Sequence, residues 1–172
     1  MPDATALELI AQELRGEDGD DTDPVLGTLF FRNRATIEIE PRAVRRVLAH
    51  LRERGYSFMA SLHGLDYYPQ EPRLGVVYEL LDMERVDRIS VKLRVPTDSA
   101  EVDSVTADWP TAELQEREVF DMFGVVFRDH PDMRRVLMPE DYEGYPQRRD
   151  FPIGGEPVLF TFNENEKLGP PR

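Results

Sequence analysis

Residues 88–95 carry the pattern that most constrains the fold of this chain. Apolar side chains alternate there with polar ones, in the order Arg88, Ile89, Ser90, Val91, Lys92, Leu93, Arg94, Val95. A period of two is typical of a β-strand that buries one face and exposes the other. Because a half-buried sheet needs cover on its apolar face, other parts of the chain must supply a second layer.

Patterns elsewhere indicate what that second layer is. Apolar residues recur at helical spacing in 4–15 and again after Pro41, which suits the first position of a helix that Gly55 would end. Further strands are expected at 28–32, 35–40, 56–64 and 74–82, and further helices at 100–107 and 111–123. We therefore predict an α+β fold, a two-layer domain with a mixed sheet and helices on one face.

The character of the chain changes after residue 128. The last 44 residues hold seven of its 14 prolines, and only 158–162 has a strand-like pattern. They also keep aromatic and aliphatic side chains that plain disorder lacks. A stretch of this length without regular structure is rarely packed within its own domain, so we predict an extended, proline-rich arm laid over another surface. The predicted organisation is an acidic helix and loop in 1–24, an α+β domain in 25–128 and a C-terminal interaction arm in 129–172.

Composition excludes several classes of function. The chain has no cysteine, which rules out disulfides, cysteine-ligated iron–sulfur clusters and a cysteine nucleophile. Its net charge of −13 would repel the phosphates of nucleic acids. There is no apolar run near the ~20 residues of a membrane span, and the acidic N-terminus does not resemble a signal peptide. We expect no nucleic acid binding, no membrane span and residence in the cytoplasm.

Carboxylates crowd the last predicted helix. Glu116, Glu118 and Asp121 are the candidates for acid–base catalysis. However, Arg117 lies four residues from both Glu113 and Asp121, a spacing at which opposite charges pair along one helix face. We therefore predict a structural charge ladder here and no catalytic residue.

Metal and cofactor sites are not indicated either. His130, Asp132, Glu140 and Asp141 have ligand chemistry, but they lie in a proline-broken segment whose spacing does not bring them together. His130 is expected instead to hydrogen-bond the turn at Pro131. The chain contains no serine nucleophile elbow, phosphate loop or Gly-x-Gly-x-x-Gly turn. We predict that this chain binds no metal and no cofactor of its own.

The basic residues favour contact with another protein. The pairs Arg134-Arg135 and Arg148-Arg149 flank the acidic residues in 140–143, with apolar residues between them. Bidentate arginines beside aromatic side chains are typical of interface anchors. A surface that pairs these charges within the chain is the alternative.

Two charged blocks in this region resemble a known family. Glu116-Arg117-Glu118-x-x-Asp121-Met122-Phe123, six further residues and then His130-x-x-x-Arg134-x-Val136-Leu137 are similar to the signature of the complex I 30-kilodalton subunit family. The similarity continues through residue 152. Tyr142, Tyr145 and Arg149 stand where family members often have Trp, His and Lys, so aromatic or cationic character is kept.

The resemblance implies a cofactor-free structural subunit in the peripheral arm of respiratory NADH:quinone oxidoreductase. That complex transfers electrons from NADH through FMN and iron–sulfur clusters to quinone, coupled to proton translocation, and other subunits carry its cofactors. The implied partners are the 49-kilodalton (D) subunit and the B subunit, on the cytoplasmic side of the cell membrane. The implied interface residues are Glu116, Arg117, Glu118, Asp121, Phe123, His130, Arg134, Arg135, Glu143, Arg148, Arg149, Asp150 and Phe151.

Two other functions remain open from the sequence. The first is an equivalent subunit of a related assembly, such as a membrane-bound hydrogenase or a ferredoxin- or F420H2-dependent complex. The second is a stand-alone hydrolase that uses the carboxylates between Glu116 and Asp121. A hydrolase of that kind should be active as an isolated chain, whereas a structural subunit should not.

Overall fold

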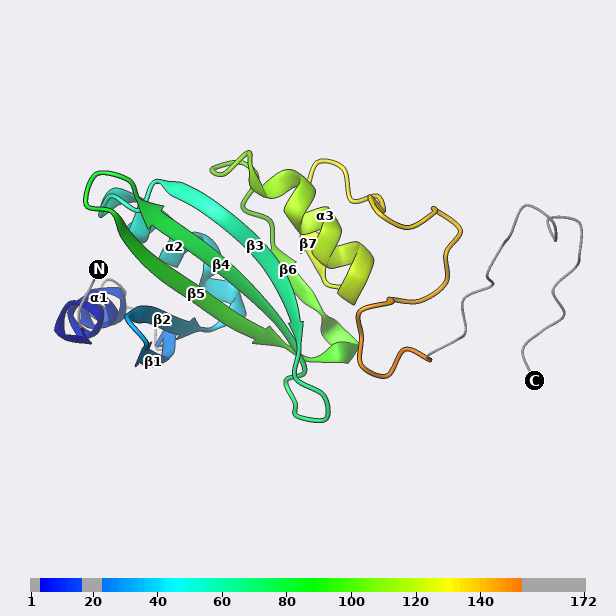
Figure 1. Ribbon diagram of the computed structural model, residues 1–172, viewed down its shortest axis with the longest axis horizontal. Helices are drawn as coiled ribbons and strands as arrows, with labels where there is room; N and C mark the ends of the chain where they lie inside the picture. The colour runs from blue at the N-terminus through cyan, green and yellow to red at the C-terminus, as the bar shows by residue number, and fades with distance from the viewer. Residues whose placement is uncertain (1–3, 17–22, 153–172) are drawn as a thin grey trace, which may run out of the picture.

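The computed structural model describes residues 4–16 and 23–152. Its centre is a five-stranded sheet with strand order β1-β2-β5-β4-β3 (Figure 1). The strands are β1 (Val25–Phe31), β2 (Arg34–Ile39), β3 (Phe58–Asp66), β4 (Leu74–Asp82) and β5 (Asp87–Val95). β2 and β5 run parallel and the other neighbours run antiparallel, so the sheet is mixed, as predicted. The predicted strand ends differ from these by a few residues, the usual margin of such assignments.

One face of the sheet forms the core. Ile37 lies beside Val91, which in turn lies beside Tyr78, and all three side chains are fully buried. The intervening residues of β5 point to the other face, where the ring of Tyr67 covers Lys92 and Arg94 at 4.7 and 4.3 Å. The alternation predicted for 88–95 is confirmed. Burial of each large apolar side chain contributes about 1.5–3 kcal/mol, so this face sets the register of the sheet.

Helices α1 (Ala4–Gly16) and α3 (Ala112–Phe123) both lie against the core face. Thr28, which pairs with Ile37, donates a hydrogen bond from its hydroxyl to Glu8 of α1. At the other edge, Gly64 pairs with Val76, and the ring of Phe123 from α3 leaves no room for a side chain at position 64. Since paired residues share a face of the sheet, the helices cover one face, and the predicted two-layer α+β fold is confirmed.

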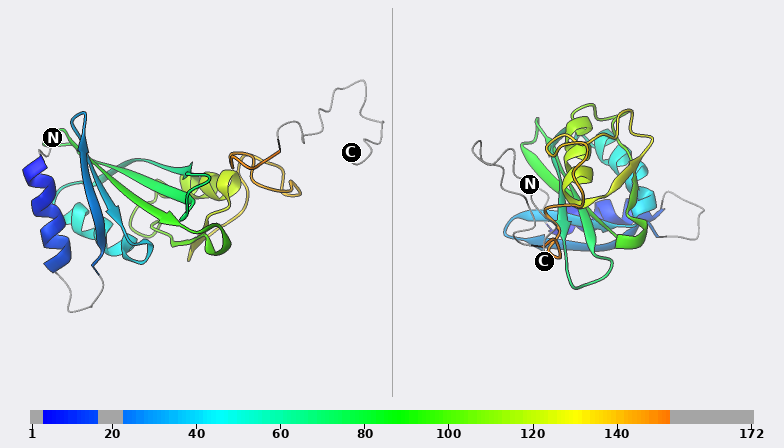
Figure 2. Two further views of the ribbon diagram at one scale, coloured as in Figure 1. Left: turned by 90° about the horizontal axis from the view of Figure 1, so that it is seen from below. Right: turned by 90° about the vertical axis from the view of Figure 1, so that its right-hand side faces the viewer.

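The second helix begins as its sequence predicts. Pro41 opens a short 3₁₀ turn, η1 (Pro41–Ala43), that continues into α2 (Val44–Glu53). The apolar side of α2 is buried and consists of Val44, Val47, Leu48 and Leu51. Gly55 follows with a φ of 104°, a left-handed conformation that glycine adopts without strain. Figure 2 shows α2 and α3 lying along the length of the sheet while α1 closes its far end.

The predicted helix at 100–107 is wrong. A 3₁₀ turn, η2 (Thr97–Ser99), leads instead into β6 (Glu101–Asp103), which pairs in parallel with β7 (Val126–Arg128). The strand β7 had no signal in the sequence. A backbone partner that far along the chain overrides the weak local helical preference of 100–107, because short segments follow their tertiary contacts.

Residues 129–152 form the described part of the C-terminal segment, which we call the arm. The arm has no regular secondary structure and runs along α3 of its own chain (Figure 1). The described part of the arm therefore contacts its own domain, and its extension over another protein stays a prediction. The loop expected in 17–22 and the strand pattern at 158–162 lie outside the described residues, and the predicted boundaries at 24 and 128 stay predictions. Within the described ranges, no helix has the length and apolar character to cross a membrane.

Candidate functional site

Asp121 is the centre of the contact between α3 and the arm. Its side chain is fully buried, and its Oδ2 accepts hydrogen bonds from the backbone N–H groups of Val136, Leu137 and Met138 at 3.0, 2.7 and 2.8 Å. Its Oδ1 accepts a fourth bond, from Nη1 of Arg135 at 2.6 Å. Burial raises the pKa of this carboxyl, but the four donors outweigh burial and hold the pKa below its ordinary value. Asp121 is therefore an ionised clamp that fixes three consecutive residues of the arm.

Two arginines and an aromatic ring extend this clamp. The Nη2 of Arg135 donates to the carbonyl of Gly144 at 3.0 Å, and Nε of Arg148 donates to the carbonyl of Phe123 at 2.6 Å. The guanidinium groups of Arg135 and Arg148 lie 5.5 and 4.4 Å from the ring centre of Tyr145. These cation–π contacts hold the second half of the arm against the C-terminal end of α3.

Gly124 makes that close approach possible. It ends α3 in the left-handed conformation, with a φ of 76°. A Cβ at this position would lie 2.5 Å from the ring of Tyr145 and 2.6 Å from Nη2 of Arg148. The glycine after Phe123 in the charged motif is thus needed both for its backbone conformation and for the packing of the arm.

A second set of contacts binds the first half of the arm. Arg117 of α3 donates to the carbonyl oxygens of Arg134 and Arg135 at 3.0 and 3.1 Å, and its Nη1 lies 3.7 Å from Oδ2 of Asp132. Arg134 makes a bidentate pair with Asp132 at 2.6 and 2.7 Å. The predicted ladder along α3 is therefore wrong. Arg117 and Asp121 pair with the arm and not with residues four positions away.

A bridged ion triplet fastens the end of the arm to the sheet. Arg73 is 7% exposed and makes bidentate pairs with Asp66, at 2.7 and 2.8 Å, and with Asp150, at 2.6 and 2.7 Å. Asp66 also accepts from the backbone N–H groups of Tyr68 and Arg149, at 2.9 and 2.7 Å. The hydrogen bonds from Arg73 outweigh burial and hold the pKa of Asp66 well below its ordinary value.

Glu116 lies behind the clamp, in the interior. Its side chain is fully buried, and its Oε1 accepts from the backbone N–H of Val105 at 2.9 Å, while Oε2 has no hydrogen bond with any described residue. Burial raises the pKa of Glu116 to about 7. The hydroxyl of Tyr78 is also buried and has no hydrogen-bond partner in the described part of the chain, and Nε2 of His130 lies 4.0 Å from Oε2 of Glu116. His130 accepts from the backbone N–H of Asp132 at 3.0 Å, as the turn prediction required.

The predicted interface residues fall into three groups. Glu116, Asp121 and Phe123 are buried, Arg117, His130, Arg135, Arg148 and Phe151 are partly buried, and Glu118, Arg134, Glu143, Arg149 and Asp150 are exposed. Charges of Asp121, Arg135 and Asp150 are paired within the chain, which is the alternative that the sequence left open. The assignment of these residues to a partner interface stays a prediction.

Sequence reasoning missed three residues of this region. Asp66 ends β3 and Arg73 directly precedes β4, on either side of a proline-rich loop. Nothing in their spacing predicts a pair with Asp150, 77 residues away from Arg73. The only signal is a charged residue directly before the apolar run of β4. Tyr78 sits at an inward position of that strand and looks like an ordinary core residue.

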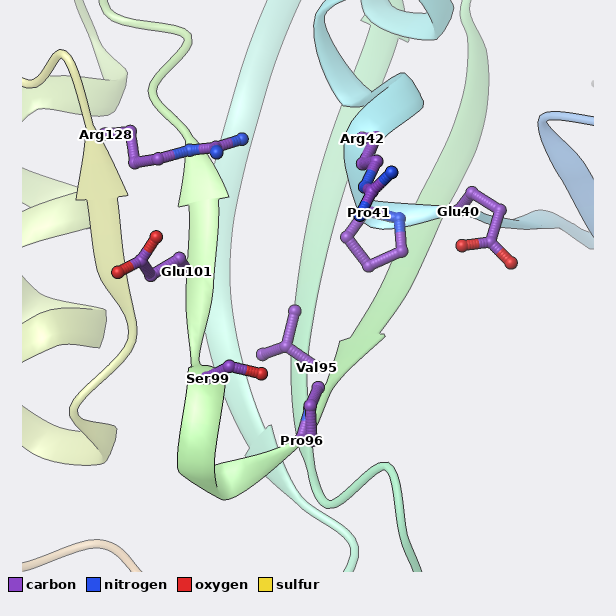
Figure 3. A pocket seen from close by; sticks show the side chains of 8 residues that line it. All are labelled: Glu40, Pro41, Arg42, Val95, Pro96, Ser99, Glu101 and Arg128. Carbon is purple, nitrogen blue, oxygen red and sulfur yellow. The ribbon is translucent and has the colours of Figure 1, made fainter. Parts of the chain in front are cut away.

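An open hollow lies between η1, β6 and β7, with a volume of about 300 Å³. In Figure 3, Arg128 extends across it toward the side that carries Arg42, above Val95. Glu40 and Glu101 line it as well, so its two acids and two bases balance, and Arg128 already pairs with Asp103 at 2.6 Å. The hollow has no net charge with which to select an ionic ligand. Among the described residues, no three His, Cys, Asp or Glu side chains are grouped as metal ligands.

The comparisons with known proteins agree with the charged motifs. A family model described as "Respiratory-chain NADH dehydrogenase, 30 Kd subunit" matches residues 37–157, which include the sheet from β2 onward, α3 and the described arm. The chain belongs to this family. The match extends from β2 to beyond the arm, so the clamp at Asp121 lies inside the family's domain.

Named relatives cover nearly the whole chain. The C subunit of NADH-quinone oxidoreductase from Roseiflexus sp. (strain RS-1) is 40% identical over 96% of this chain and 92% of its own length. "NADH-quinone oxidoreductase subunit 5" of Thermus thermophilus is 36% identical over 90% of this chain and 76% of its own length.

Two solved structures share the fold. One is the trypsin-resistant fragment of Nqo5, 29% identical, with a TM-score of 0.59 over 73% of this chain and 98% of the fragment. The other belongs to the membrane-bound sulfane sulfur reductase, an archaeal respiratory membrane complex. It is 27% identical, with a TM-score of 0.71 over 87% of this chain and 85% of that one.

Proposed function

We propose that this chain is a structural subunit of a respiratory NADH-quinone oxidoreductase, without an active site of its own. Its partners are the 49-kilodalton (D) and B subunits, and it lies in the peripheral arm of the complex, on the cytoplasmic side of the membrane. FMN, the iron–sulfur clusters and quinone belong to other subunits. The names of the full-length relatives support the assignment to the complex.

The observation that carries this proposal is the direction in which the arm presents its side chains. Because Asp121 draws the N–H groups of three consecutive residues inward, the side chains of Val136 and Leu137 turn outward. They are 38% and 59% exposed. The arm holds these apolar side chains in contact with water. A second protein that covers them would lower the free energy of the assembly, which is how interface anchors act.

The carboxylates of α3 support a structural role over a chemical one. Asp121 already accepts four hydrogen bonds, and Glu116 is fully buried with one oxygen bonded to Val105. A general base needs a lone pair that a substrate can reach. Neither of these carboxylates offers one. Glu118 is exposed but would have to act without a second carboxylate of the set, which argues against the hydrolase alternative.

The test is assembly of the complex around altered full-length chains. Replacing Val136 and Leu137 together by Asp should lower recovery of the complex on a tagged chain by about tenfold or more, since each anchor is worth over about 1 kcal/mol. The matched control is Leu9→Asp, because Leu9 is also about half exposed, at 53%, but lies on α1. Normal recovery of the complex with the double variant would refute the proposal. Turnover of a small ester or amide by the isolated chain, lost in Asp121→Asn, would favour the hydrolase.

A related respiratory assembly is the second candidate. The chain shares its fold with a subunit of the sulfane sulfur reductase complex over most of both lengths. Mass spectrometry of the proteins that co-purify with the tagged chain separates the two. NADH- and flavin-binding subunits among them favour the oxidoreductase, and a preparation without them favours a related complex with another electron donor.

A further inference from the structure

Two hairpin turns meet at the end of the sheet farthest from the arm. The β1–β2 turn and the β4–β5 turn both lie at that end of the sheet (Figure 2), and residues of both line one hollow. Because β2 and β5 run parallel with Ala35 beside Ile89, Arg34 and Arg88 occupy neighbouring positions just before that pair. We call the following residues the sheet-end cluster: Arg32, Arg34, Leu81, Met83, Val86 and Arg88. They line a hollow of about 470 Å³.

Two arginines of this cluster have no counter-charge among the described residues. The side chains of Arg34 and Arg88 make no hydrogen bond or ion pair with any residue in 4–16 or 23–152. Two acidic residues also line the hollow, but their carboxylates are engaged with other side chains. Asp82 pairs with Arg85, and Asp87 accepts from the hydroxyl of Tyr56 at 2.9 Å. Like charges side by side on one sheet destabilise it, so this end of the sheet favours an added anion.

Apolar side chains beside these arginines are unusually exposed. Val86 is 81% exposed, Met83 65% and Phe31 62%. Val86 also has a φ of 53°, a left-handed conformation that is rare for a β-branched residue. No contact within the described residues offsets the cost of exposing this side chain or of holding its backbone in the left-handed conformation. An apolar and cationic surface of this kind matches a ligand that carries both apolar and anionic groups.

We propose that the sheet-end cluster binds an acidic segment of a partner protein. An apolar side chain of that segment enters the hollow against Met83 and Val86, and flanking carboxylates pair with Arg34 and Arg88. Arg34 and Arg88 favour carboxylates at this end of the sheet, and a short segment can place them there without approaching the acidic remainder of the chain. A second copy or an anionic membrane surface would face much more of the molecule, whose net charge of −13 would repel it. This inference rests on the proposed function in one respect, since it assumes that the chain works within a multi-subunit assembly.

Two variants separate binding from folding. Val86→Gly removes the apolar side chain and relieves the left-handed conformation, so the isolated chain should be at least as stable as the wild type. Arg34→Glu relieves the repulsion from Arg88, so it too should leave the fold intact while opposing an acidic ligand. The control is Arg42→Glu, an exposed arginine outside the cluster.

The experiment places a photo-reactive residue at Met83 in the full chain, expressed in its own cells, and maps the adducts by mass spectrometry. Support requires adducts in a protein segment with carboxylates beside an apolar residue. Their yield should fall about tenfold with Val86→Gly and with Arg34→Glu, but not with Arg42→Glu. Replacing the mapped carboxylates by Lys should restore the yield in the Arg34→Glu background.

The inference would be overturned by adducts to lipid or to a second copy of the chain, or by the absence of any adduct. It would also be overturned if Arg34→Glu left the adduct yield unchanged. The same preparation shows whether the chain co-purifies with respiratory subunits. If it does so without the expected adduct, only the sheet-end proposal fails. If it does not, the proposed function fails, and the adduct map still decides what the cluster binds.

Discussion

Asp121→Asn should release the arm from α3 while leaving the sheet folded. The substitution keeps the size of the side chain but removes the charge that four donors share. A hydrogen bond to a charged group is worth about 1 kcal/mol more than a neutral one, so four bonds lose about 4 kcal/mol. That sum agrees with the ~3–5 kcal/mol measured when one partner of a buried ion pair is removed.

Hydrogen exchange of the backbone amides measures this loss directly. A loss of about 4 kcal/mol corresponds to roughly 10³-fold faster exchange at residues 136–138, because each 1.4 kcal/mol is a factor of ten. Amides of β5 should exchange at the wild-type rate, since they belong to the core. Glu118→Gln is the matched control, because Glu118 is an exposed carboxylate of the same helix. Unchanged protection at 136–138 in Asp121→Asn would refute the clamp.

The remaining predictions concern burial, charge and backbone conformation. Glu116→Gln should flatten the dependence of stability on pH. The folded pKa of about 7 exceeds the ordinary 4.5, so the contribution of Glu116 to stability is fully present below about pH 4.5 and falls by about 3 kcal/mol as pH rises to 7. Urea unfolding at pH 4 and pH 8 checks this, and an equal slope in both proteins would contradict it. Arg73→Met should lower the free energy of unfolding by about 3–5 kcal/mol, because it leaves Asp66 buried without its counter-charge. Urea unfolding measures that loss, and a stability within error of the wild type would exclude the triplet as a stabilising element. Gly124→Ala should lower the free energy of unfolding by about 1–2 kcal/mol because of the positive φ, and it should displace Tyr145. Backbone amides after residue 144 should then exchange faster with solvent. Unaltered exchange of those amides would show that the turn tolerates a side chain.

The periodic patterns of the sequence correctly predicted the helices and strands that bury one face, such as α2 and β5. The alternation in 88–95 and the helical spacing after Pro41 both arise because one face of the element is buried. The strand and the helix can therefore be recognised from the local sequence alone. The predicted helix at 100–107 failed because its strand partner, β7, lies more than 20 residues further along the chain. Pairing over that separation leaves no periodic trace in so short a segment.

The sequence singled out residues of this region as interface candidates, but it did not predict their contacts within the chain. The charged motif spans α3 and the arm, but the sequence analysis placed the two in separate units, and their mutual contacts were found only in the structure. Which residue pairs with which depended on the path of the arm, and 129–152 has no periodicity from which to derive that path. The role of Arg73 illustrates the limit, because its partner Asp150 is brought close only when the arm has passed the end of α3.

Thiol labelling of Leu137→Cys tests the central claim most directly. The wild-type chain has no cysteine, so the introduced thiol is the only one in the chain to react. In the isolated chain it should react rapidly, because Leu137 is 59% exposed on an arm held by Asp121. In the assembled complex its labelling rate should fall by about tenfold or more, as expected for a side chain covered at the centre of an interface. Equal labelling rates in the isolated chain and in the complex would contradict the account.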